Sequence, residues 1–199
     1  MEASLASPEV TDPASRLKAK LCLVGEPEVG KTSLVRRFVQ NQFDGAYVST
    51  LGVKVSTRKV IVPVPSRDER FAVDMTIWDI MGVRRFRELL KDAYFYGARG
   101  ILAVCDITRK DTCNELNAWL CDVFRVTGPL PVRILANKAD LAEKRVVTDE
   151  DIRPLSEKYR APFLLTSAKT GQNVQAGFES LAAAIAEEEV GRAVGAAPD

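Results

Sequence analysis

The sequence predicts one α/β domain: a mostly parallel six-stranded sheet with one antiparallel edge strand and helices on both faces. Two observations predict it. Short apolar segments alternate with segments whose apolar residues recur at helical spacing, and 199 residues suffice for one well-packed domain but are few for two. We expect the folded domain at residues 18–188, between disordered tails at 1–17 and 189–199 that are rich in small residues.

The predicted strands are of two kinds. Continuous apolar runs, typical of strands buried on both faces, occupy residues 20–25, 100–106, 131–137 and 161–167. Residues 53–64 and 70–78 instead alternate between polar and apolar side chains, which predicts a hairpin at one edge of the sheet. The polar residues 65–69 (PSRDE) join them, and we expect the loop around residues 63–70 (PVPSRDER) to be long, as either a partner-binding feature or a tolerated surface insertion.

Helices are predicted where apolar residues return every three or four positions, at residues 31–40, 84–96, 111–126, 149–159 and 173–188. The third of these helices has a single apolar face, made by Leu116, Trp119, Leu120, Val123 and Phe124. Helices that alternate with buried strands cover both faces of a parallel sheet. In such folds, ligands bind at the carboxyl ends of the strands.

Properties of the whole chain exclude several classes of function. The net charge of +1 provides no general attraction to nucleic acid. Four cysteines form no C-x-x-C pair and histidine is absent, so we expect reduced core thiols in a cytoplasmic protein rather than a zinc site. The sequence contains no signal peptide, membrane-spanning run or lipidation motif, which predicts a soluble monomer without a covalent membrane anchor.

The strongest motif is GEPEVGKT, residues 25–32, which matches G-x-x-x-x-G-K-[ST] between a predicted strand and a predicted helix. Gly25 and Gly30 let the backbone wrap closely around phosphate, while loop N–H groups and the helix N-terminus supply positive potential. Lys31 is expected to bridge the β- and γ-phosphates, and the Thr32 hydroxyl to bind Mg²⁺. The alternative is an ordinary turn with a solvated lysine, but the flanking structure favours a P-loop NTPase fold.

Two further motifs end predicted strands. In NKAD, residues 137–140, the terminal carboxylate can accept hydrogen bonds from guanine N1–H and N2–H₂, a donor pair that adenine lacks. SAK, residues 167–169, can offer a backbone N–H to the guanine carbonyl. Each motif alone also fits a plain turn, but in order at successive strand ends they support one another. The expected guanine-binding residues are Asn137, Lys138, Asp140, Ser167, Ala168 and Lys169.

With these motifs, YVSTLGVKV at 47–55 and WDIMG at 78–82, the chain resembles a small GTPase of the Ras superfamily across residues 18–188. The segment YFYGARGILAVCDIT resembles the Rab-type branch most. The resemblance implies a switch that binds GTP or GDP with Mg²⁺ and changes two segments, residues 43–53 and 79–94, when GTP is hydrolysed. It also implies an exchange factor, an activating protein and effectors as partners.

The resemblance implies site residues that the motifs alone do not assign. Nucleotide contacts are implied at Glu28, Val29 and Ser33 in the phosphate loop and first helical turn, at Phe43 beside the guanine, at Tyr47 across the phosphates, and at Gly82 on the γ-phosphate. Thr50 and Asp79 are implied as Mg²⁺-binding residues alongside Thr32. The implied catalytic residues, which act by positioning and charge neutralisation, are Lys31, Thr50 and Gly82.

The sequence departs from the family at residues that matter for hydrolysis. Val83 stands where members usually carry the glutamine that orients the attacking water, and valine can neither donate nor accept a hydrogen bond. In the phosphate loop, Pro27 removes one N–H from the cradle and Glu28 adds a negative charge. We therefore expect slow hydrolysis unless a partner supplies the missing group.

Two other functions stay open at this point. One is a scaffold that holds GTP without meaningful turnover, which Val83 favours. The other is an adenine-specific P-loop ATPase or kinase, against which the Asp140 carboxylate argues because adenine offers it no pair of donors.

Overall fold

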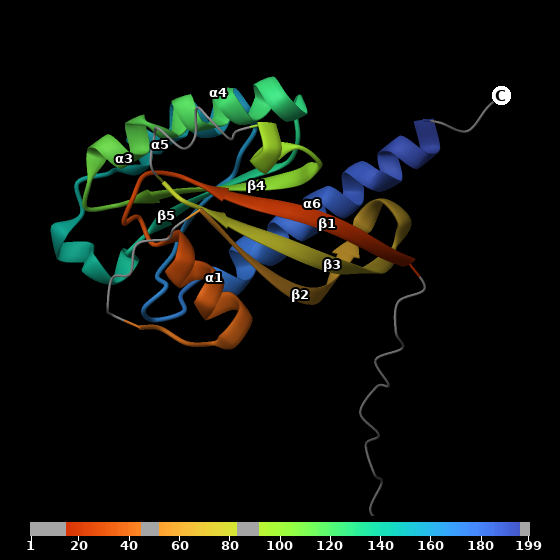
Figure 1. Ribbon diagram of the computed structural model, residues 1–199, viewed down its shortest axis with the longest axis horizontal. Coiled ribbons are helices and arrows are strands. Elements are labelled where there is room, and N and C mark those ends of the chain that lie inside the picture. The colour runs from red at the N-terminus through yellow and green to blue at the C-terminus, as the bar shows by residue number, and fades with distance from the viewer. Residues whose placement is uncertain (1–14, 45–51, 83–91, 196–199) are drawn as a thin grey trace, which may run out of the picture.

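The computed structural model describes residues 15–44, 52–82 and 92–195. Its centre is a six-stranded sheet in the order β2-β3-β1-β4-β5-β6, shown in Figure 1. Strand β2 runs antiparallel to β3 at one edge, and all other neighbours are parallel. The strands are β1 Ser15–Val24, β2 Val53–Val64, β3 Glu69–Ile80, β4 Ala98–Asp106, β5 Val132–Asn137 and β6 Phe163–Leu165. The predicted α/β fold class is confirmed.

Helices cover both faces of this sheet. They are α1 Lys31–Gln40, α3 Lys110–Asn114, α4 Leu116–Thr127, α5 Asp149–Tyr159 and α6 Val174–Gly195, with 3₁₀ turns η1 Pro65–Arg67 and η2 Ala139–Lys144. Helices α1 and α6 pack on one face, and α3, α4 and α5 on the other (Figure 1). Across the described residues, none of the helices combines the length and the apolar composition needed to cross a bilayer.

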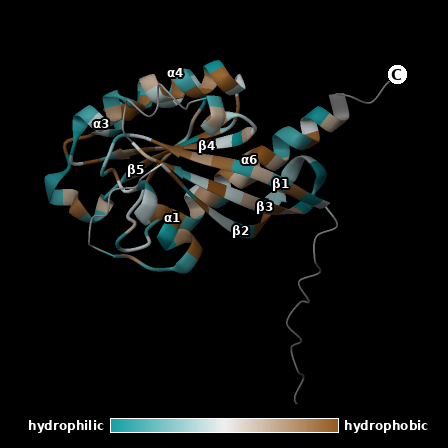
Figure 2. Cartoon of the chain, in the orientation of Figure 1, coloured by the Kyte–Doolittle hydropathy of each residue, from teal (hydrophilic) through white to brown (hydrophobic). Residues whose placement is uncertain are grey.

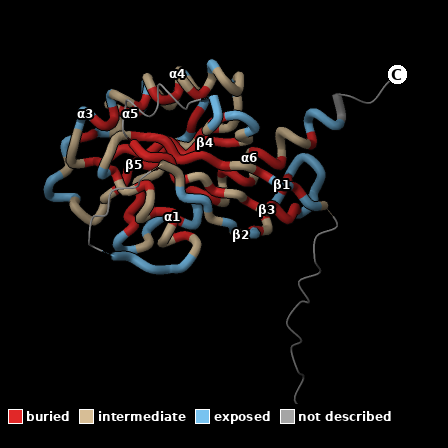
Figure 3. Tube along the Cα trace, viewed as in Figure 1, coloured by how far each residue is buried: buried red, intermediate tan, exposed pale blue. Residues whose placement is uncertain are grey.

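Two apolar cores, one on each face, hold the layers together. Figures 2 and 3 show that the central strands are hydrophobic and buried, whereas polar, exposed residues lie on the outer surfaces of the helices. On the α1–α6 side, the rings of Phe38 and Phe178 stack with centroids 4.0 Å apart. The guanidinium of Arg58 lies 4.2 Å from the Phe38 ring centroid, so a cation caps the stack.

The hairpin differs from the prediction of a long loop at residues 63–70. The β2–β3 ladder continues to the pair Val64 and Glu69, so only a four-residue turn separates the strands. The extra length lies in the strands because Val62, Val64 and Phe71 are buried in the core beneath α6. Half of the polar stretch, Pro63, Val64, Glu69 and Arg70, is therefore paired sheet.

Several element boundaries also differ. Strand β1 begins at Ser15, inside the predicted tail, because residues 15–19 pair with residues 71–75 of the long β3. Helix α6 continues past residue 189 to Gly195, and Val190 is buried. The helix predicted at 111–126 is divided into α3 and α4, which meet at Glu115. Of the helix predicted at 84–96, residues 84–91 lie outside the described part, and 92–95 are helical.

The Phe38–Phe178 stack generates a stability prediction. Replacing Phe178 by alanine removes a fully buried ring where α6 packs against α1, leaving a cavity. We expect Phe178→Ala to lower the free energy of unfolding by roughly 3–5 kcal/mol in urea denaturation. The matched control is Val146→Ala, an exposed apolar residue whose loss should change stability by less than about 0.5 kcal/mol. Equal effects of the two substitutions would contradict this account of the core.

Candidate nucleotide-binding site

The loop between β1 and α1 has a backbone that two glycines make possible. Gly25 and Gly30 have φ angles of 139° and 98°, which L-residues rarely adopt. A Cβ on Gly25 would collide with the Val104 carbonyl oxygen, and a Cβ on Gly30 with the amide nitrogen of Asn137. Both positions therefore need glycine for two reasons, conformation and close approach to neighbouring strands.

The loop is closed around its own lysine. The Nζ of Lys31 donates to the backbone oxygens of Gly25 at 2.6 Å and Glu26 at 2.8 Å. Burial lowers the pKa of Lys31 from its ordinary value of 10.5 to about 8, although the nearby charge of Asp79 opposes the shift. A buried ammonium without full charge compensation is a strong site for an anion.

Beside the lysine lies a pair that fits a divalent cation. The Thr32 hydroxyl donates to Asp79 Oδ2 at 2.5 Å, and Asp79 is 1% exposed. Burial raises the pKa of Asp79, with the Thr32 hydrogen bond and the Lys31 charge acting in the opposite direction. Among the described residues, no donor contacts the buried Asp79 Oδ1. An orphaned carboxylate oxygen next to a hydroxyl has the chemistry that Mg²⁺ requires.

No group of three or more His, Cys, Asp or Glu side chains in the described part of the chain could hold a metal ion unaided. Mg²⁺ keeps several waters and is usually held by one or two protein oxygens together with phosphates, and Thr32 and Asp79 can supply such oxygens. The residues therefore fit Mg²⁺ that arrives with a phosphorylated ligand.

Gly82, which follows the end of β3, touches the outer turn of the phosphate loop. A Cβ there would lie 2.6 Å from Pro27 N, 2.7 Å from Glu26 C and 2.8 Å from Gly25 O. Only glycine allows the chain after β3 to approach the loop so closely. The prediction that Gly82 belongs to the phosphate site agrees with this placement, but its predicted γ-phosphate contact stays a prediction.

The side chain of Asn137, at the end of β5, contacts two other loops. Its Nδ2 donates to Val29 O in the phosphate loop at 2.8 Å, while its Oδ1 accepts from Ala168 N at 3.2 Å and Thr166 Oγ1 at 3.3 Å. The side chain thus connects the phosphate loop to the loop after β6. Its role is to fix the distance between the two ends of the site.

The predicted base-reading residues gather around this connection. Asp140 Oδ1 accepts a hydrogen bond from Ser167 Oγ at 2.5 Å, which joins the NKAD and SAK segments. Lys138 has a positive φ of 69°, and its Nζ forms an ion pair with Asp106 Oδ2 at 2.6 Å. Ala168 is buried and Lys169 exposed. The structure brings the two motifs together as the sequence predicts.

The remaining predicted residues have mixed outcomes. Val29 is buried, Ser33 is half-buried in the first turn of α1, and Glu28 is exposed with a positive φ of 66°. Tyr47, Thr50 and Val83 lie outside the described residues, so their predicted roles are untested.

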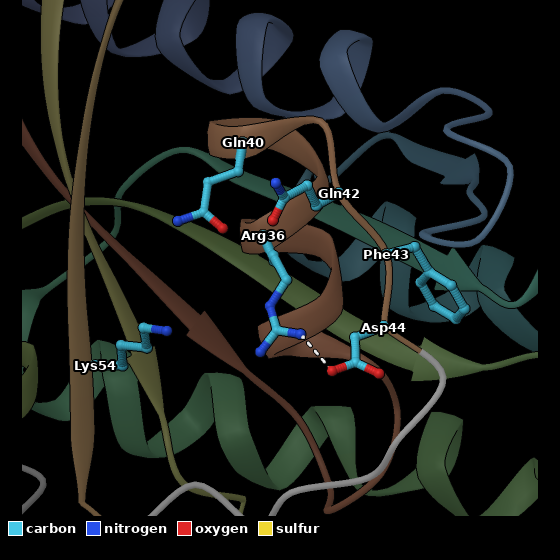
Figure 4. A pocket seen from close by; sticks show the side chains of 6 residues that line it. All are labelled: Arg36, Gln40, Gln42, Phe43, Asp44 and Lys54. Carbon is cyan, nitrogen blue, oxygen red and sulfur yellow. Dashed lines mark hydrogen bonds and ion pairs between the residues drawn. The ribbon is translucent and has the colours of Figure 1, made fainter.

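Phe43 is 39% exposed and lines a groove of about 530 Å³ beyond the end of α1. The other residues lining this groove are polar or charged: Arg36, Gln40, Gln42, Asp44 and Lys54. In Figure 4, the Phe43 ring lies apart from the Arg36–Asp44 ion pair. An exposed ring at this position is able to pack against a ligand, but its predicted contact with guanine stays a prediction.

Four residues of the site were missed by sequence reasoning. Arg37 in α1 donates to the backbone oxygens of Ala168 at 2.9 Å and Lys169 at 2.6 Å, and so supports the SAK loop. The others are Asp106, Arg109 and Trp119, which follow β4 and contact Lys138 or the phosphate loop. Asp106 had a usable signal, since it is an acid at the end of a buried strand. Arg37, Arg109 and Trp119 had none.

A loop of this kind, with its lysine buried and its ends tied to the next strands, is characteristic of P-loop nucleotide-binding proteins, and fold and site together define that class. Comparison with known sequences gives a narrower assignment. The Ras family profile matches residues 20–187. The chain belongs to the Ras family, and its relatives show it to be a Rab-like member.

Three relatives illustrate the similarity. Ras-related protein RIC1 of Oryza sativa is 36% identical over 167 residues, 83% of this chain and 79% of the relative. Ras-related protein Rab-37 of Homo sapiens is 34% identical over 181 residues, 88% and 78% of the two chains. GTP-binding protein YPTM1 of Zea mays is 36% identical over 173 residues, 86% and 80% of the two chains.

The buried ammonium of Lys31 generates a pH-dependent prediction. Its folded-state pKa of about 8 lies below the ordinary 10.5, so the destabilisation is complete below pH 8 and disappears as pH rises towards 10.5. We expect nucleotide-free Lys31→Met to be more stable than the unmodified protein by roughly 1–3 kcal/mol at pH 7. In urea unfolding, this gap should narrow between pH 8 and 10.

The control for this prediction is Lys144→Met, which removes an exposed lysine from η2 and should give no gap that varies with pH. A Lys31→Met variant that is less stable at pH 7, or a gap that is constant from pH 7 to 10, would contradict the burial of a charged ammonium.

Proposed function

We propose that this protein is a guanine-nucleotide switch that binds GTP and GDP with Mg²⁺ and hydrolyses GTP slowly. One observation carries the proposal: the Asn137 amide fixes a buried lysine loop at one end of the site and the Asp140–Ser167 pair at the other. The Lys31 loop and the Asp140 carboxylate are held at a fixed separation by Asn137. This arrangement suits a ligand that has phosphates at one end and a base with hydrogen-bond donors at the other.

The phosphate end has defined tasks for each residue. Lys31 and the loop N–H groups bind the β- and γ-phosphates, for which the buried ammonium supplies charge. Thr32 and Asp79, with Thr50, hold Mg²⁺, which supplies charge neutralisation when it is bound. The Gly82 N–H contacts the γ-phosphate, in keeping with its approach to the loop.

The base end selects guanine. Asp140 accepts hydrogen bonds from the N1–H and N2–H₂ of the base, and Ser167 holds the carboxylate in place. The Lys138 stem packs along the base, the Ala168 N–H serves the guanine carbonyl, and Phe43 covers its edge. The relative YPTM1 is itself described as a GTP-binding protein, which supports the assignment of guanine over adenine.

Hydrolysis is slow because Val83 offers no hydrogen bond to the attacking water. Unassisted Ras turns over on the order of 10⁻⁴ s⁻¹, and this chain should be no faster. As a cytoplasmic monomer it would then depend on an exchange factor, an activating protein that supplies the missing group, and an effector that reads the two switch segments.

Val83 also favours a second candidate, a GTP-binding scaffold with negligible turnover. The two candidates share the nucleotide site and differ only in whether bound GTP is hydrolysed.

Base selection by Asp140 is tested by Asp140→Asn. Asparagine presents an amide N–H₂ where the carboxylate accepted, so it should reject the guanine donors and pair with the extra oxygen of xanthine. We expect the affinity for GDP to fall by at least about 100-fold and the affinity for xanthosine diphosphate to rise, measured by calorimetric titration. Asp149→Asn, in the first turn of α5, is the control; Asp149 is half-buried and pairs with Arg145, and the variant should bind GDP normally. Unchanged GDP affinity in Asp140→Asn would remove the basis for guanine selection.

Turnover is tested by single-turnover phosphate release from bound GTP, with and without cell extract. We expect release at or below about 10⁻⁴ s⁻¹ alone, and about 10-fold faster release from Val83→Gln, because the glutamine restores water positioning. Thr32→Ala is the negative control, since it removes a predicted Mg²⁺ residue. Release no faster than the uncatalysed background in the unmodified protein, with or without extract, would establish the scaffold instead of the enzyme.

A further inference from the structure

The outer side of the phosphate loop is held by two side chains from the segment that follows β4. Arg109 Nη2 donates to the Pro27 carbonyl oxygen at 2.7 Å, and Trp119 Nε1 donates to Glu26 Oε1 at 2.9 Å. Trp119 is fully buried in α4, and its hydrogen bond holds the Glu26 carboxylate in place. Neither contact belongs to the phosphate-loop motif itself.

Arg109 also connects the loop to the base end of the site. Its Nε lies 3.4 Å from Asp106 Oδ2, and the same oxygen lies 2.6 Å from Lys138 Nζ. The other carboxylate oxygen of Asp106 accepts from the Thr108 N–H at 2.9 Å and the Thr108 hydroxyl at 2.7 Å. The Asp106 carboxylate therefore bridges Arg109, which contacts the phosphate loop, and Lys138, which belongs to the NKAD motif.

Asp106 is ionised in this arrangement. Burial opposes its ionisation, but hydrogen bonds from Lys138 and Thr108 outweigh the burial and lower its pKa. The carboxylate can thus hold two positive side chains through the neutral pH range. Asp106 is 1% exposed, but the side chains of Arg109 and Lys138 are 36% and 32% exposed, so solvent screens these contacts in part.

This phosphate loop has an unusual need for such support. Pro27 provides no N–H, so the loop has one donor fewer to hold its own turn or a ligand. Glu26 and Glu28 add two negative charges to a loop expected to receive phosphates. The Arg109 guanidinium donates to the Pro27 carbonyl oxygen, and so it fixes the turn from outside and adds positive charge. That charge acts on the site, because it lowers the pKa of Lys31 in addition to the larger effect of burial.

We infer that Arg109 is a positioning residue for the phosphate-binding loop: by fixing the Pro27 carbonyl and sharing Asp106 with Lys138, it holds the loop N–H groups in register with the base-binding end. This rests on the proposed nucleotide binding. Arg109 acts through the loop rather than on the base, so its contribution grows with the number of phosphates that the ligand places in the cradle.

The test compares GDP and GMP binding to the full-length protein and to Arg109→Ala by calorimetric titration with Mg²⁺. We expect GDP affinity to fall about 5- to 30-fold, the range for losing a partly exposed charged hydrogen bond. GMP affinity should fall less than about 2-fold, because GMP places a single phosphate in the loop. Arg109→Lys keeps the charge but lacks the fork that reaches both partners, so its GDP affinity should lie between the two.

The matched control is Arg125→Ala, which removes an arginine of α4 that pairs with Asp122 and does not touch the loop; its GDP affinity should equal that of the unmodified protein. Equal losses for GDP and GMP in Arg109→Ala would indicate general damage and overturn the inference, as would unchanged GDP binding. An Arg109→Lys variant that binds GDP as weakly as Arg109→Ala would also overturn it. If the alanine variant does not fold, Arg109→Lys carries the test, and either unchanged GDP affinity or equal losses for GDP and GMP in that variant would overturn the inference. An unmodified protein that binds no GDP would instead refute the proposed function, and the inference with it.

Discussion

The side-chain amide of Asn137 is the contact on which the rest of the site depends. It is 1% exposed, and it joins the loops after β1 and β6 to the end of β5 through three hydrogen bonds. An apolar side chain there would leave a buried carbonyl, a buried N–H and a buried hydroxyl without that partner, and unsatisfied buried polar groups are costly. The same amide explains Gly30, since any Cβ at that position would collide with its nitrogen.

Around this connection the molecule accepts unfavourable burial where a charged ligand is expected. Lys31 has a depressed pKa, Asp79 a raised one, and Asp79 Oδ1 has no donor among the described residues. These features weaken the empty fold, and a phosphate with Mg²⁺ would supply the missing partners and gain affinity from doing so. Asp106 differs, since its carboxylate lies within ion-pair distance of Arg109 and Lys138 and accepts two hydrogen bonds from Thr108, and so it acts as structure rather than as a ligand site.

Features that depend on local sequence patterns could be predicted from the sequence, and features that depend on contacts between distant residues could not. The sheet, the phosphate loop and the NKAD and SAK motifs depend on local spacing, so residues 25–32, 137–140 and 167–169 were identified without the structure. The hairpin strands were predicted at 53–64 and 70–78, close to the observed β2 and β3. Only the expected long loop differs, since pairing continues to Val64 and Glu69 and leaves a four-residue turn. The supports from Arg37 and Arg109 join residues 131 and 82 positions apart, which no local pattern encodes.

The central claim is that this site holds a guanine nucleotide. It is tested most directly by identifying the nucleotide that co-purifies with the full-length protein, using denaturation, chromatography and mass spectrometry. The account predicts GDP or GTP at close to one molecule per chain, retained with Mg²⁺ and released when the metal is chelated. An adenine nucleotide at that stoichiometry, or protein that carries no nucleotide and takes up neither GDP nor GTP when they are added with Mg²⁺, would contradict it.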